Sequence, residues 1–389
     1  MNIFAVIAEF NPFHKGHQFL LDEARRLGAD CLIVILSGSF VQRGEPALFS
    51  KKMRAQTAIE GGADLAVELP LPFSCASAEY FARAGVHLAK ALGATHLLFG
   101  SECGDIEKLQ NAAEVYQAAL ETPEFFKKIN DNGSFPALRQ EYFEQTAGKE
   151  TAALFKGPNN LLGIEYIRAV KAFSSSGEKN GGNLIPVTVL RKTEHDQNML
   201  SSKKLREKIM AGDLALGEWM PEHALKTVQK EVGAGRAVCA EKLEPVLLAV
   251  LRKMDTEQIA LIADVSEGLE NRIFKAAMKA GSRKELIDLI KTKRYTLARI
   301  RRILTAALLG ITKDDLRVLP PYIRILAAND EGKRILKRAK LPVTASPSKI
   351  KSRFPRQVAL SAFGEDLLTL CMQTPHPAGE DYRLRIERE

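Results

Sequence analysis

Two histidines stand at a predicted strand-to-helix junction near the start of the chain. The apolar run over residues 3–8 predicts a buried strand, and apolar residues at helical spacing over 18–27 predict a helix. Between them lies an H-x-G-H pattern formed by His14, Gly16 and His17. A helix start offers unpaired backbone N–H groups and the positive end of the helix dipole. With two imidazole donors beside it, this junction predicts a site for nucleotide phosphates.

A second cluster of polar residues follows the last predicted strand. Ser201 and Ser202 are suited to cap a helix, and Lys203, Lys204 and Arg206 fall in its first turns. Cations are unfavourable at a helix N-terminus unless an anion lies there too. The cluster therefore predicts a second phosphate contact. The alternative is a basic helix face that is simply solvated.

The elements that position these residues alternate along the first half of the chain. Further strands are predicted at residues 31–36, 65–69, 96–99 and 185–190, with helices at 51–60 and 78–92. Apolar strands alternating with helices are typical of a parallel sheet covered on both faces, so the predicted fold class is α/β with a Rossmann-like sheet. Ligands bind such sheets beyond the carboxyl ends of the strands. The loops at 37–49 and 100–104 are expected at that edge.

The remaining patterns are helical and suggest two domains. Residues from about 105 to 182 are predicted to form a helical insertion in a first, catalytic and nucleotide-binding domain that spans residues 1–215. After residue 220 the sequence shows helix patterns and no convincing strand. An all-α C-terminal domain is therefore expected over residues 216–389.

Positive charge is concentrated in the second half of the chain. The formal net charge is +9, yet residues 271–310 alone hold eleven Lys or Arg against two acidic residues. Residues 331–356 hold nine against one, so the rest of the chain is net acidic. Basic character confined to one region is the electrostatic footprint of a surface that binds a polyanion. The alternative is that these cations only keep a helical domain in solution.

Several classes of protein are disfavoured by what the sequence lacks. It has no G-x-x-x-x-G-K-[ST] loop, no G-x-G-x-x-G after the first strand and no G-x-S-x-G elbow. The five cysteines are scattered without a C-x-x-C pair, and there is no H-E-x-x-H, so neither a disulfide framework nor a protein-bound metal is predicted. No apolar run is long enough to span a bilayer, and no signal peptide pattern is present. We expect a cytoplasmic protein without a membrane segment and without an evident stable protein partner.

The motifs together resemble those of a known family. H-x-G-H after the first strand, with S-S-x-x-L-R after the last, resembles the nucleotidyltransferase superfamily, although Lys203 replaces a threonine often found there. Longer segments closely resemble the bacterial tRNA(Met) cytidine acetate ligases, and they run through most of the chain: EFNPFHKGH, SGSFVQRGEPA, GADLAVELP, EYFARAGVHLAKALGATHLLFGSE, GPNNLLGIEYI and KRYTLARIRR.

The resemblance implies an ATP-dependent ligase. Such an enzyme makes acetyl-adenylate from acetate and ATP, then acetylates the exocyclic amine of the wobble cytidine of elongator tRNA(Met) to give N4-acetylcytidine. The implied catalytic residues are His14, His17, Lys203 and Arg206. The implied ATP-binding residues are Ile7, Ala8, Glu9, Phe10, Asn11, Pro12, Phe13, His14, Lys15, Gly16, His17, Gln18, Phe19, Leu20, Gly100, Asn159, Arg191, Lys192, Ser201 and Ser202. Asn160 is an equally good neighbour at the position given to Asn159.

The positive charge of residues 271–310 leads to the hypothesis that this segment binds the tRNA. The residues expected to contact tRNA phosphates are Lys291, Lys293, Arg294, Arg299, Arg301 and Arg302. Mg²⁺ bridging the phosphates of ATP is expected, although no protein ligand for it is evident from the sequence. Acetate is the expected second substrate.

Two other functions stay open at this point. A small-molecule adenylyltransferase of the same superfamily would use the same N-terminal motifs but would not need a basic helical domain. A non-catalytic RNA-binding protein would keep the basic helices but would not turn over ATP.

Overall fold

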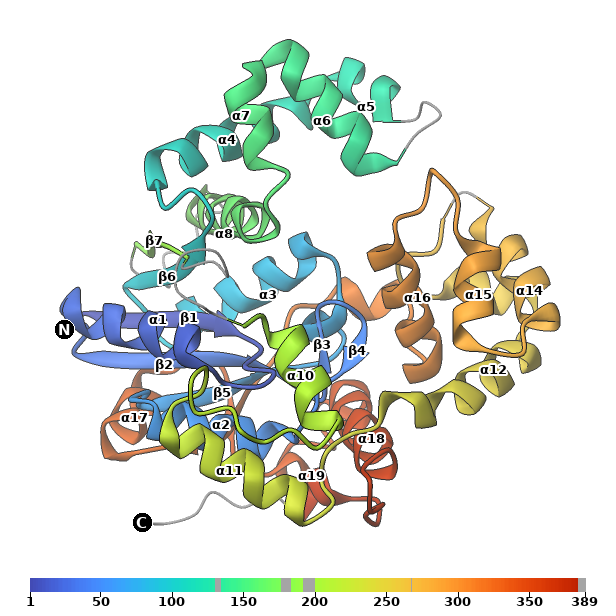
Figure 1. Cartoon of the computed structure of the whole chain (residues 1–389). Helices are drawn as coiled ribbons and strands as arrows, with labels where there is room; N and C mark the ends of the chain where they lie inside the picture. Colours follow the sequence, from blue (N-terminus) through green and yellow to red (C-terminus); the bar gives the residue numbers. More distant parts are fainter. Residues whose placement is uncertain (130–133, 176–182, 192–199, 267, 384–389) are drawn as a thin grey trace.

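A mostly parallel sheet forms the centre of the protein. Within residues 1–129, 134–175, 183–191, 200–266 and 268–383, which the computed structural model describes, seven strands form this sheet and helices surround it (Figure 1). Its order is β7 (Ile185–Leu190), β6 (His96–Ser101), β1 (Ile3–Ala8), β2 (Cys31–Ser37), β5 (Leu65–Leu69), β8 (Ile323–Ala328) and β9 (Val343–Thr344). A separate two-stranded hairpin pairs β3 (Phe40–Val41) with β4 (Glu45–Pro46).

The helices follow the strands in chain order. In the first half they are α1 (Lys15–Arg26), α2 (Lys51–Glu60), the short helix η1 (Phe73–Cys75), α3 (Ala78–Ala91), α4 (Ile106–Ala119), α5 (Pro123–Ile129), α6 (Phe135–Thr146), α7 (Gly148–Leu154) and α8 (Pro158–Ser175). In the second half they are α10 (Ser202–Met210), α11 (Glu222–Gly233), α12 (Glu244–Lys253), α13 (Thr256–Leu261), α14 (Leu269–Lys279), α15 (Arg283–Ile290), α16 (Leu297–Leu309), α17 (Asp330–Ile335), α18 (Pro355–Leu370) and α19 (Glu380–Arg383). No described helix is long and apolar enough to cross a membrane.

The strand order places a switch point between β1 and β6. The chain runs outward from β1 through β2 to β5 and then returns to the other side of β1 with β6 and β7, all in parallel. In open α/β sheets the ligand site lies beyond the carboxyl ends of the strands at such a point. The H-x-G-H segment directly follows β1, so the fold places it there.

Alternation along the strands builds a core on each face of the sheet. Ile33 and Ile35 of β2 face α3, α4 and α8, whereas Leu32, Val34 and Leu36 face α1, α2, α10 and α11. Successive strand side chains point to opposite faces, which explains why the apolar runs of β1, β2 and β5 are continuous rather than alternating. The predicted strands 3–8, 31–36, 65–69, 96–99 and 185–190 are confirmed.

A third apolar core lies within the C-terminal helices. It joins α12, α14, α15, α16 and α18 and includes Phe40 and Val41 of the β3–β4 hairpin and Cys75 of η1. Figure 1 shows this helical group beside the sheet, with the hairpin between them. The predicted loop 37–49 is therefore the segment against which the C-terminal helices pack.

One expectation about the C-terminal half is wrong. No strand was expected after residue 220, yet β8 pairs antiparallel with β5 and β9 extends the sheet by one more strand. The segment Ile323-Arg324-Ile325-Leu326 was not predicted as a strand because Arg324 interrupts its apolar pattern. This arginine is buried and lies 3.6 Å from Asp381. The sheet therefore takes strands from both of the predicted domains.

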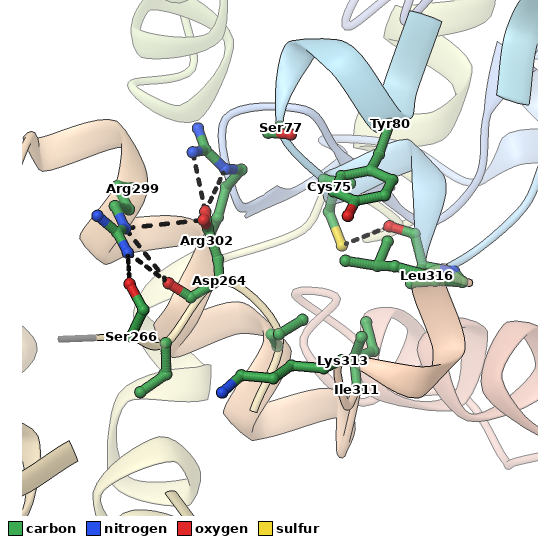
Figure 2. Close-up of a pocket in the computed structure, with 15 residues that line it drawn as sticks. Cys75, Ser77, Tyr80, Asp264, Ser266, Arg299, Arg302, Ile311, Lys313 and Leu316 are labelled. Atoms are coloured by element: carbon green, nitrogen blue, oxygen red, sulfur yellow. Dashed lines mark hydrogen bonds and ion pairs between the residues drawn. The ribbon is translucent and has the colours of Figure 1, made fainter. Parts of the chain in front are cut away.

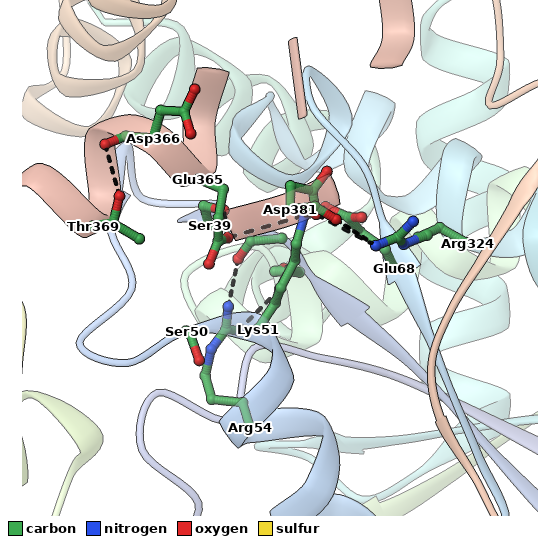
Figure 3. Close-up of polar contacts among 12 residues, drawn as sticks. Ser39, Ser50, Lys51, Arg54, Glu68, Arg324, Glu365, Asp366, Thr369 and Asp381 are labelled. Atoms are coloured by element: carbon green, nitrogen blue, oxygen red, sulfur yellow. Dashed lines mark hydrogen bonds and ion pairs between the residues drawn. The ribbon is translucent and has the colours of Figure 1, made fainter. Parts of the chain in front are cut away.

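A buried group of charges ties the C-terminal segments to the sheet (Figure 3). The Lys51 side chain is 0% exposed, and its ammonium lies 2.9 Å from Glu68 of β5, 2.7 Å from Asp381 of α19 and 4.0 Å from Glu365 of α18. Burial by itself would lower the pKa of Lys51, but the three carboxylates outweigh it and raise that pKa. The lysine stays charged, so this group depends on ion pairing.

Candidate active site

The turn that leaves β1 directs the two histidines toward the switch point. Phe10 has a backbone φ of 45°, a strained value for a residue with a large side chain. Its ring is fully buried against Phe13 and His17, with ring centroids 4.9 and 4.8 Å away. Apolar packing therefore holds the turn and positions His14 as the N-cap of α1.

The two histidines cap α1 reciprocally. His14 Nδ1 accepts a hydrogen bond from the Gly16 N–H (3.1 Å), and His17 Nδ1 accepts one from the His14 N–H (3.3 Å). The rings stack with their centroids 3.7 Å apart. Because each Nδ1 is an acceptor, the proton of each neutral ring must sit on Nε2. The cap thus fixes two Nε2–H donors.

Both imidazoles are held neutral. Burial, followed by the nearby Arg191 charge, lowers the pKa of His14 to about 4. Burial, then His14 and Arg191, lowers the pKa of His17 well below its ordinary value. At neutral pH the pair therefore donates hydrogen bonds without carrying charge, and the cationic part of the site comes from arginines.

We expect the low pKa of His14 to appear as a pH dependence of stability. The unfolded chain takes up a proton near pH 6.5 and the folded chain only near 4, so stability is complete above pH 6.5 and declines as the pH falls toward 4. Between pH 7 and pH 5 the wild type should lose about 2 kcal/mol more than His14→Asn, which keeps a capping side chain but cannot ionise. Urea unfolding at both pH values measures this; equal losses would contradict the assignment.

The backbone N–H groups at the start of α1 are already paired. Lys15 N–H donates to the Trp219 carbonyl (2.9 Å), Gly16 N–H to His14 Nδ1, and His17 N–H to the His14 carbonyl (2.8 Å). The expectation of unpaired amides at this junction is therefore wrong. What the junction offers an anion is side-chain donors and the helix dipole.

The second motif meets the first through two hydrogen bonds. His14 Nε2 lies 3.1 Å from Ser202 Oγ, and since its Nδ1 is an acceptor, Nε2–H is the donor. Arg206 Nη1 donates to the Asn11 carbonyl (2.8 Å). Ser201 caps α10 by accepting the Lys204 N–H. The structure thus brings together His14, His17, Ser202 and Arg206 from opposite ends of the first domain.

Lys203 does not join this group. Its side chain is 73% exposed, and its ammonium lies 3.7 Å from Glu207 one helical turn away. Ser202 and Arg206 are four residues apart and share the face of α10 that meets His14 and Asn11, whereas Lys203 is turned about 100° from Ser202 around the helix. Three of the four predicted catalytic residues are therefore assembled.

A third side of the site is built by β6, α8 and the end of β7. Arg191 Nη1 donates to Asn159 Oδ1 (2.6 Å), and the Asn159 side-chain amide donates to Glu102 (2.6 Å). A Cβ on Gly100 would lie 2.8 Å from the Arg191 side chain, so glycine leaves room for it. Asn160 instead accepts the Cys103 N–H. Of the two asparagines, Asn159 is the one beside Arg191.

The other predicted ATP-binding residues fall into two groups. Ile7, Ala8 and Glu9 are half-buried at the carboxyl end of β1. The Gln18 amide, however, donates to the Gly61 carbonyl (2.9 Å), and Leu20 packs in the core, so both side chains serve the fold. The predicted Lys192 lies outside the described residues.

Sequence reasoning missed two residues that organise the site. Arg54 of α2 is fully buried and donates to the carbonyls of Glu9, Ser37 and Phe49, which fixes the ends of β1 and β2. Glu45 of β4 lies 3.7 Å from Arg206. Since the partners of Arg54 are backbone carbonyls, no sequence pattern could reveal it.

Glu45 also connects the site to the C-terminal helices. Arg301 of α16 donates to Glu45 (3.0 Å), and Thr305 of α16 donates to the Gly44 carbonyl (2.8 Å). A Cβ on Gly44 would lie 2.7 Å from the α16 backbone, so only glycine permits this approach. The hairpin thus lies between the phosphate motif and α16.

The predicted tRNA-binding residues lie partly on the surface and partly against acidic side chains of the protein. Lys291, Lys293 and Arg294 are exposed. Arg301 pairs with Glu45, and Arg299 and Arg302 both contact Asp264. The paired arginines therefore also contribute to structure.

The arrangement is suited to binding a nucleoside triphosphate at the end of β1. It combines two neutral imidazole donors with the guanidinium groups of Arg191 and Arg206, and such donors can stabilise charge that develops on a phosphoryl group. In the part of the chain that the structure describes, no group of three acidic, histidine or cysteine side chains could hold a metal ion.

The chain is similar to known proteins over nearly its whole length. The family described as HIGH Nucleotidyl Transferase matches residues 1–381. A tRNA(Met) cytidine acetate ligase of Acetivibrio thermocellus is 37% identical, covering 99% of both chains, and one of Syntrophomonas wolfei is 35% identical over 88% of this chain and 85% of the other. The crystal structure of Thermotoga maritima TmcAL bound with alpha-thio ATP superposes with a TM-score of 0.86 at 28% identity, covering 96% of this chain and 95% of that one.

Proposed function

This chain belongs to the HIGH nucleotidyl transferase family, and we propose that it is an ATP-dependent tRNA(Met) cytidine acetate ligase. The observation that carries the proposal is the contact between its two phosphate motifs. His14 of the first motif donates to Ser202 of the second, with Arg206 alongside, in a chain similar over nearly its whole length to enzymes of that name.

The reaction has two steps. An acetate oxygen attacks the α-phosphorus of ATP, the bond to the β-phosphate oxygen breaks, and pyrophosphate leaves, which gives acetyl-adenylate. The N4 nitrogen of the wobble cytidine of elongator tRNA(Met) then attacks the acetyl carbonyl carbon. AMP leaves with the electrons of the carbonyl carbon–oxygen bond, and N4 loses one proton. Activation is required because the lone pair of that amine is delocalised into the ring.

The residues at the end of β1 serve the first step. His17 Nε2–H has no acceptor among the described residues, so it is open to donate to a phosphoryl oxygen. The Ser202 hydroxyl, held by His14, provides a second donor, and Arg206 balances charge on the departing pyrophosphate. Arg191 and Asn159 are placed to bind the nucleotide on the side of β6.

Mg²⁺ is proposed to enter with ATP. Among the described residues, no cluster of three acidic, histidine or cysteine side chains could hold Mg²⁺ by itself. Mg²⁺ usually keeps several waters and is held mainly by substrate phosphates. When bound there, Mg²⁺ partly neutralises the triphosphate. The protein then needs only to orient the phosphates, which the two motifs do.

The C-terminal helices are proposed to bind the tRNA. Lys291, Lys293 and Arg294 lie exposed just before α16, where tRNA phosphates can reach them. Arg299, Arg301 and Arg302 are proposed to shape this surface while they remain paired with Asp264 and Glu45. The cytoplasm, where tRNA is found, is the compartment that this assignment requires.

The test is exchange of labelled pyrophosphate into ATP, with and without acetate. We expect exchange that depends on acetate and proceeds without tRNA, and N4-acetylcytidine in elongator tRNA(Met) when tRNA is added, detected by mass spectrometry of the nucleosides. A bulky carboxylate such as benzoate is the negative control. Acetate-independent exchange, or exchange without acetylated tRNA, would indicate a small-molecule adenylyltransferase instead.

A further inference from the structure

A pocket that is lined by none of the phosphate-motif residues lies between the sheet domain and the C-terminal helices (Figure 2). Its volume is about 240 Å³. One wall is formed by η1 and the start of α3, the other by the segment before α14 together with α16. Both walls carry apolar side chains that can contact a flat ring: Pro72, Ala76, Val265, Ala306, Ile311 and Leu316.

The charge in the pocket is positive. Arg299 and Arg302 share the single carboxylate of Asp264, with Arg302 Nη2 2.9 Å from Asp264 Oδ2. Lys313 also lines the pocket, and its ammonium forms no ion pair within the described residues. Burial raises the pKa of the Cys75 thiol to about 12, so this thiol adds no negative charge. Among the described residues that line the pocket, three cations face one anion, which favours an anionic ligand.

Asp264 is held in a strained conformation to make this arrangement. Its backbone φ is 69°, which is uncommon for a residue other than glycine. In that conformation its carbonyl accepts from Arg299 while its carboxylate accepts from Arg302. Strain of this kind persists where surrounding contacts enforce it and is concentrated at binding sites. The two guanidinium groups are therefore fixed on one side of the pocket.

Opposite the arginines, polar groups are open to a ligand. Figure 2 shows Tyr80 and Ser77 on the side of α3, across from Arg299 and Arg302. Ser77 is the N-cap of α3, but its hydroxyl makes no capping hydrogen bond. The Tyr80 hydroxyl has no hydrogen-bond partner in the part of the chain that is described. The pocket thus offers an aromatic ring and hydroxyl groups facing fixed cations.

One residue links the pocket to the ATP motif. Gln42 N–H donates to the Glu9 carboxylate at the end of β1 (2.9 Å), and the Gln42 side chain donates to the Ala76 carbonyl in the pocket wall (3.3 Å). The pocket therefore lies at the same edge of the sheet as the phosphate motifs. A tRNA bound on α16 would pass near this pocket on its way to the adenylate, because α16 residues line the pocket.

We propose that this pocket binds an unstacked nucleotide of the tRNA, with its base against Tyr80 and its phosphate bound by Lys313. The inference deepens the proposed function and rests on it. Enzymes that modify a base hold the loop open by taking nucleotides out of the stack, and aromatic rings are the usual platforms for such bases. The neighbouring basic segment supplies the rest of the polyanion contact.

The test compares tRNA binding by four variants. Tyr80→Leu removes the aromatic face but keeps the apolar packing, and Tyr80→Phe keeps the ring. Lys313→Gln removes the cation proposed to bind the phosphate, and Lys230→Gln on α11, which packs on the other face of the sheet, removes a charge elsewhere. Binding of elongator tRNA(Met) is measured by fluorescence anisotropy at several salt concentrations. Acetate-dependent pyrophosphate exchange without tRNA reports the fold and the ATP site.

We expect Tyr80→Leu to weaken tRNA binding by about tenfold or more, and Tyr80→Phe to bind within about twofold of wild type. Lys313→Gln should weaken binding and make the salt slope shallower by about 0.7 to 0.9, as expected when one phosphate contact is lost, whereas Lys230→Gln should not. Exchange without tRNA should stay unchanged in all four variants.

Other outcomes overturn the proposal. If either Tyr80→Leu or Lys313→Gln binds tRNA as tightly as Lys230→Gln, the pocket does not hold a nucleotide of the tRNA. If these variants instead raise the KM for ATP in exchange, the pocket serves ATP. A wild type that shows no acetate-dependent exchange would contradict the proposed function itself, and so the two failures are distinguishable.

Discussion

Changing His17 to glutamine is expected to slow acetyl-adenylate formation by about 100-fold or more, the usual effect of losing one donor to the transition state. Glutamine at this position can still accept the His14 N–H and so preserve the cap of α1. What it loses is the Nε2–H that the imidazole holds open toward the phosphates. His14→Asn, which keeps a capping side chain but loses the contact with Ser202, should show a similar loss.

The measurement is acetate-dependent pyrophosphate exchange at saturating ATP, with tRNA affinity as the control for folding. Lys203→Gln is the matched control within the second motif, because its side chain is exposed and paired with Glu207. We expect Lys203→Gln to exchange within about threefold of wild type, in line with the small effects of most surface substitutions. Near-normal exchange by a His14→Asn, His17→Gln double variant would refute the assignment of both histidines.

Lys51→Met should destabilise the protein by about 3–5 kcal/mol, the range found when one partner of a buried ion pair is removed. The substitution leaves Glu68, Asp381 and Glu365 facing one another without the lysine between them. Methionine has a similar length and is apolar, so the loss reports charge rather than volume. Urea unfolding measures it, with exposed Lys52→Met as the control, expected within about 0.5 kcal/mol.

The deficit of Lys51→Met should also depend on pH with a definite sign. Burial already raises the pKa of Glu365, and Lys51 is the strongest influence that lowers it, so without the ammonium that pKa rises further above its unfolded value. Groups of that kind contribute stability when protonated and lose it as the pH rises. The difference from wild type should therefore be larger at alkaline than at acidic pH. A difference that does not change with pH would mean that the carboxylates are compensated in another way.

The strands that were predicted correctly are those that can be recognised from their own residues, without knowledge of distant partners. β1 and β2 are continuous apolar runs that end at polar or glycine-containing turns, so burial on both faces could be inferred without knowledge of their neighbours. β8 was missed because Arg324 interrupts its run. That arginine is tolerated in the sheet only because Asp381 lies beside it, 57 residues further along the chain. A pattern of neighbouring residues cannot indicate a partner that lies so far away in the sequence.

The candidate site shows the same limit. His14 and His17 were found because a short motif between a strand and a helix carries both the residues and their context. Lys203 was grouped with them because composition alone does not say which face of α10 turns inward. Likewise, the charge count over 271–310 could not show that Arg299 and Arg302 share Asp264, since that acid lies outside the segment.

The buried contact between Lys51 and Asp381 also bears on how the protein is made. Synthesis proceeds from the N-terminus, so β1, β2 and β5 leave the ribosome long before β8 and α19 do. Until those last segments appear, β5 has an unpaired edge and Lys51 lacks two of its three carboxylates, Glu365 and Asp381. A translation product cut short before Asp381 is therefore expected to be a substrate for proteolysis rather than a free adenylating domain.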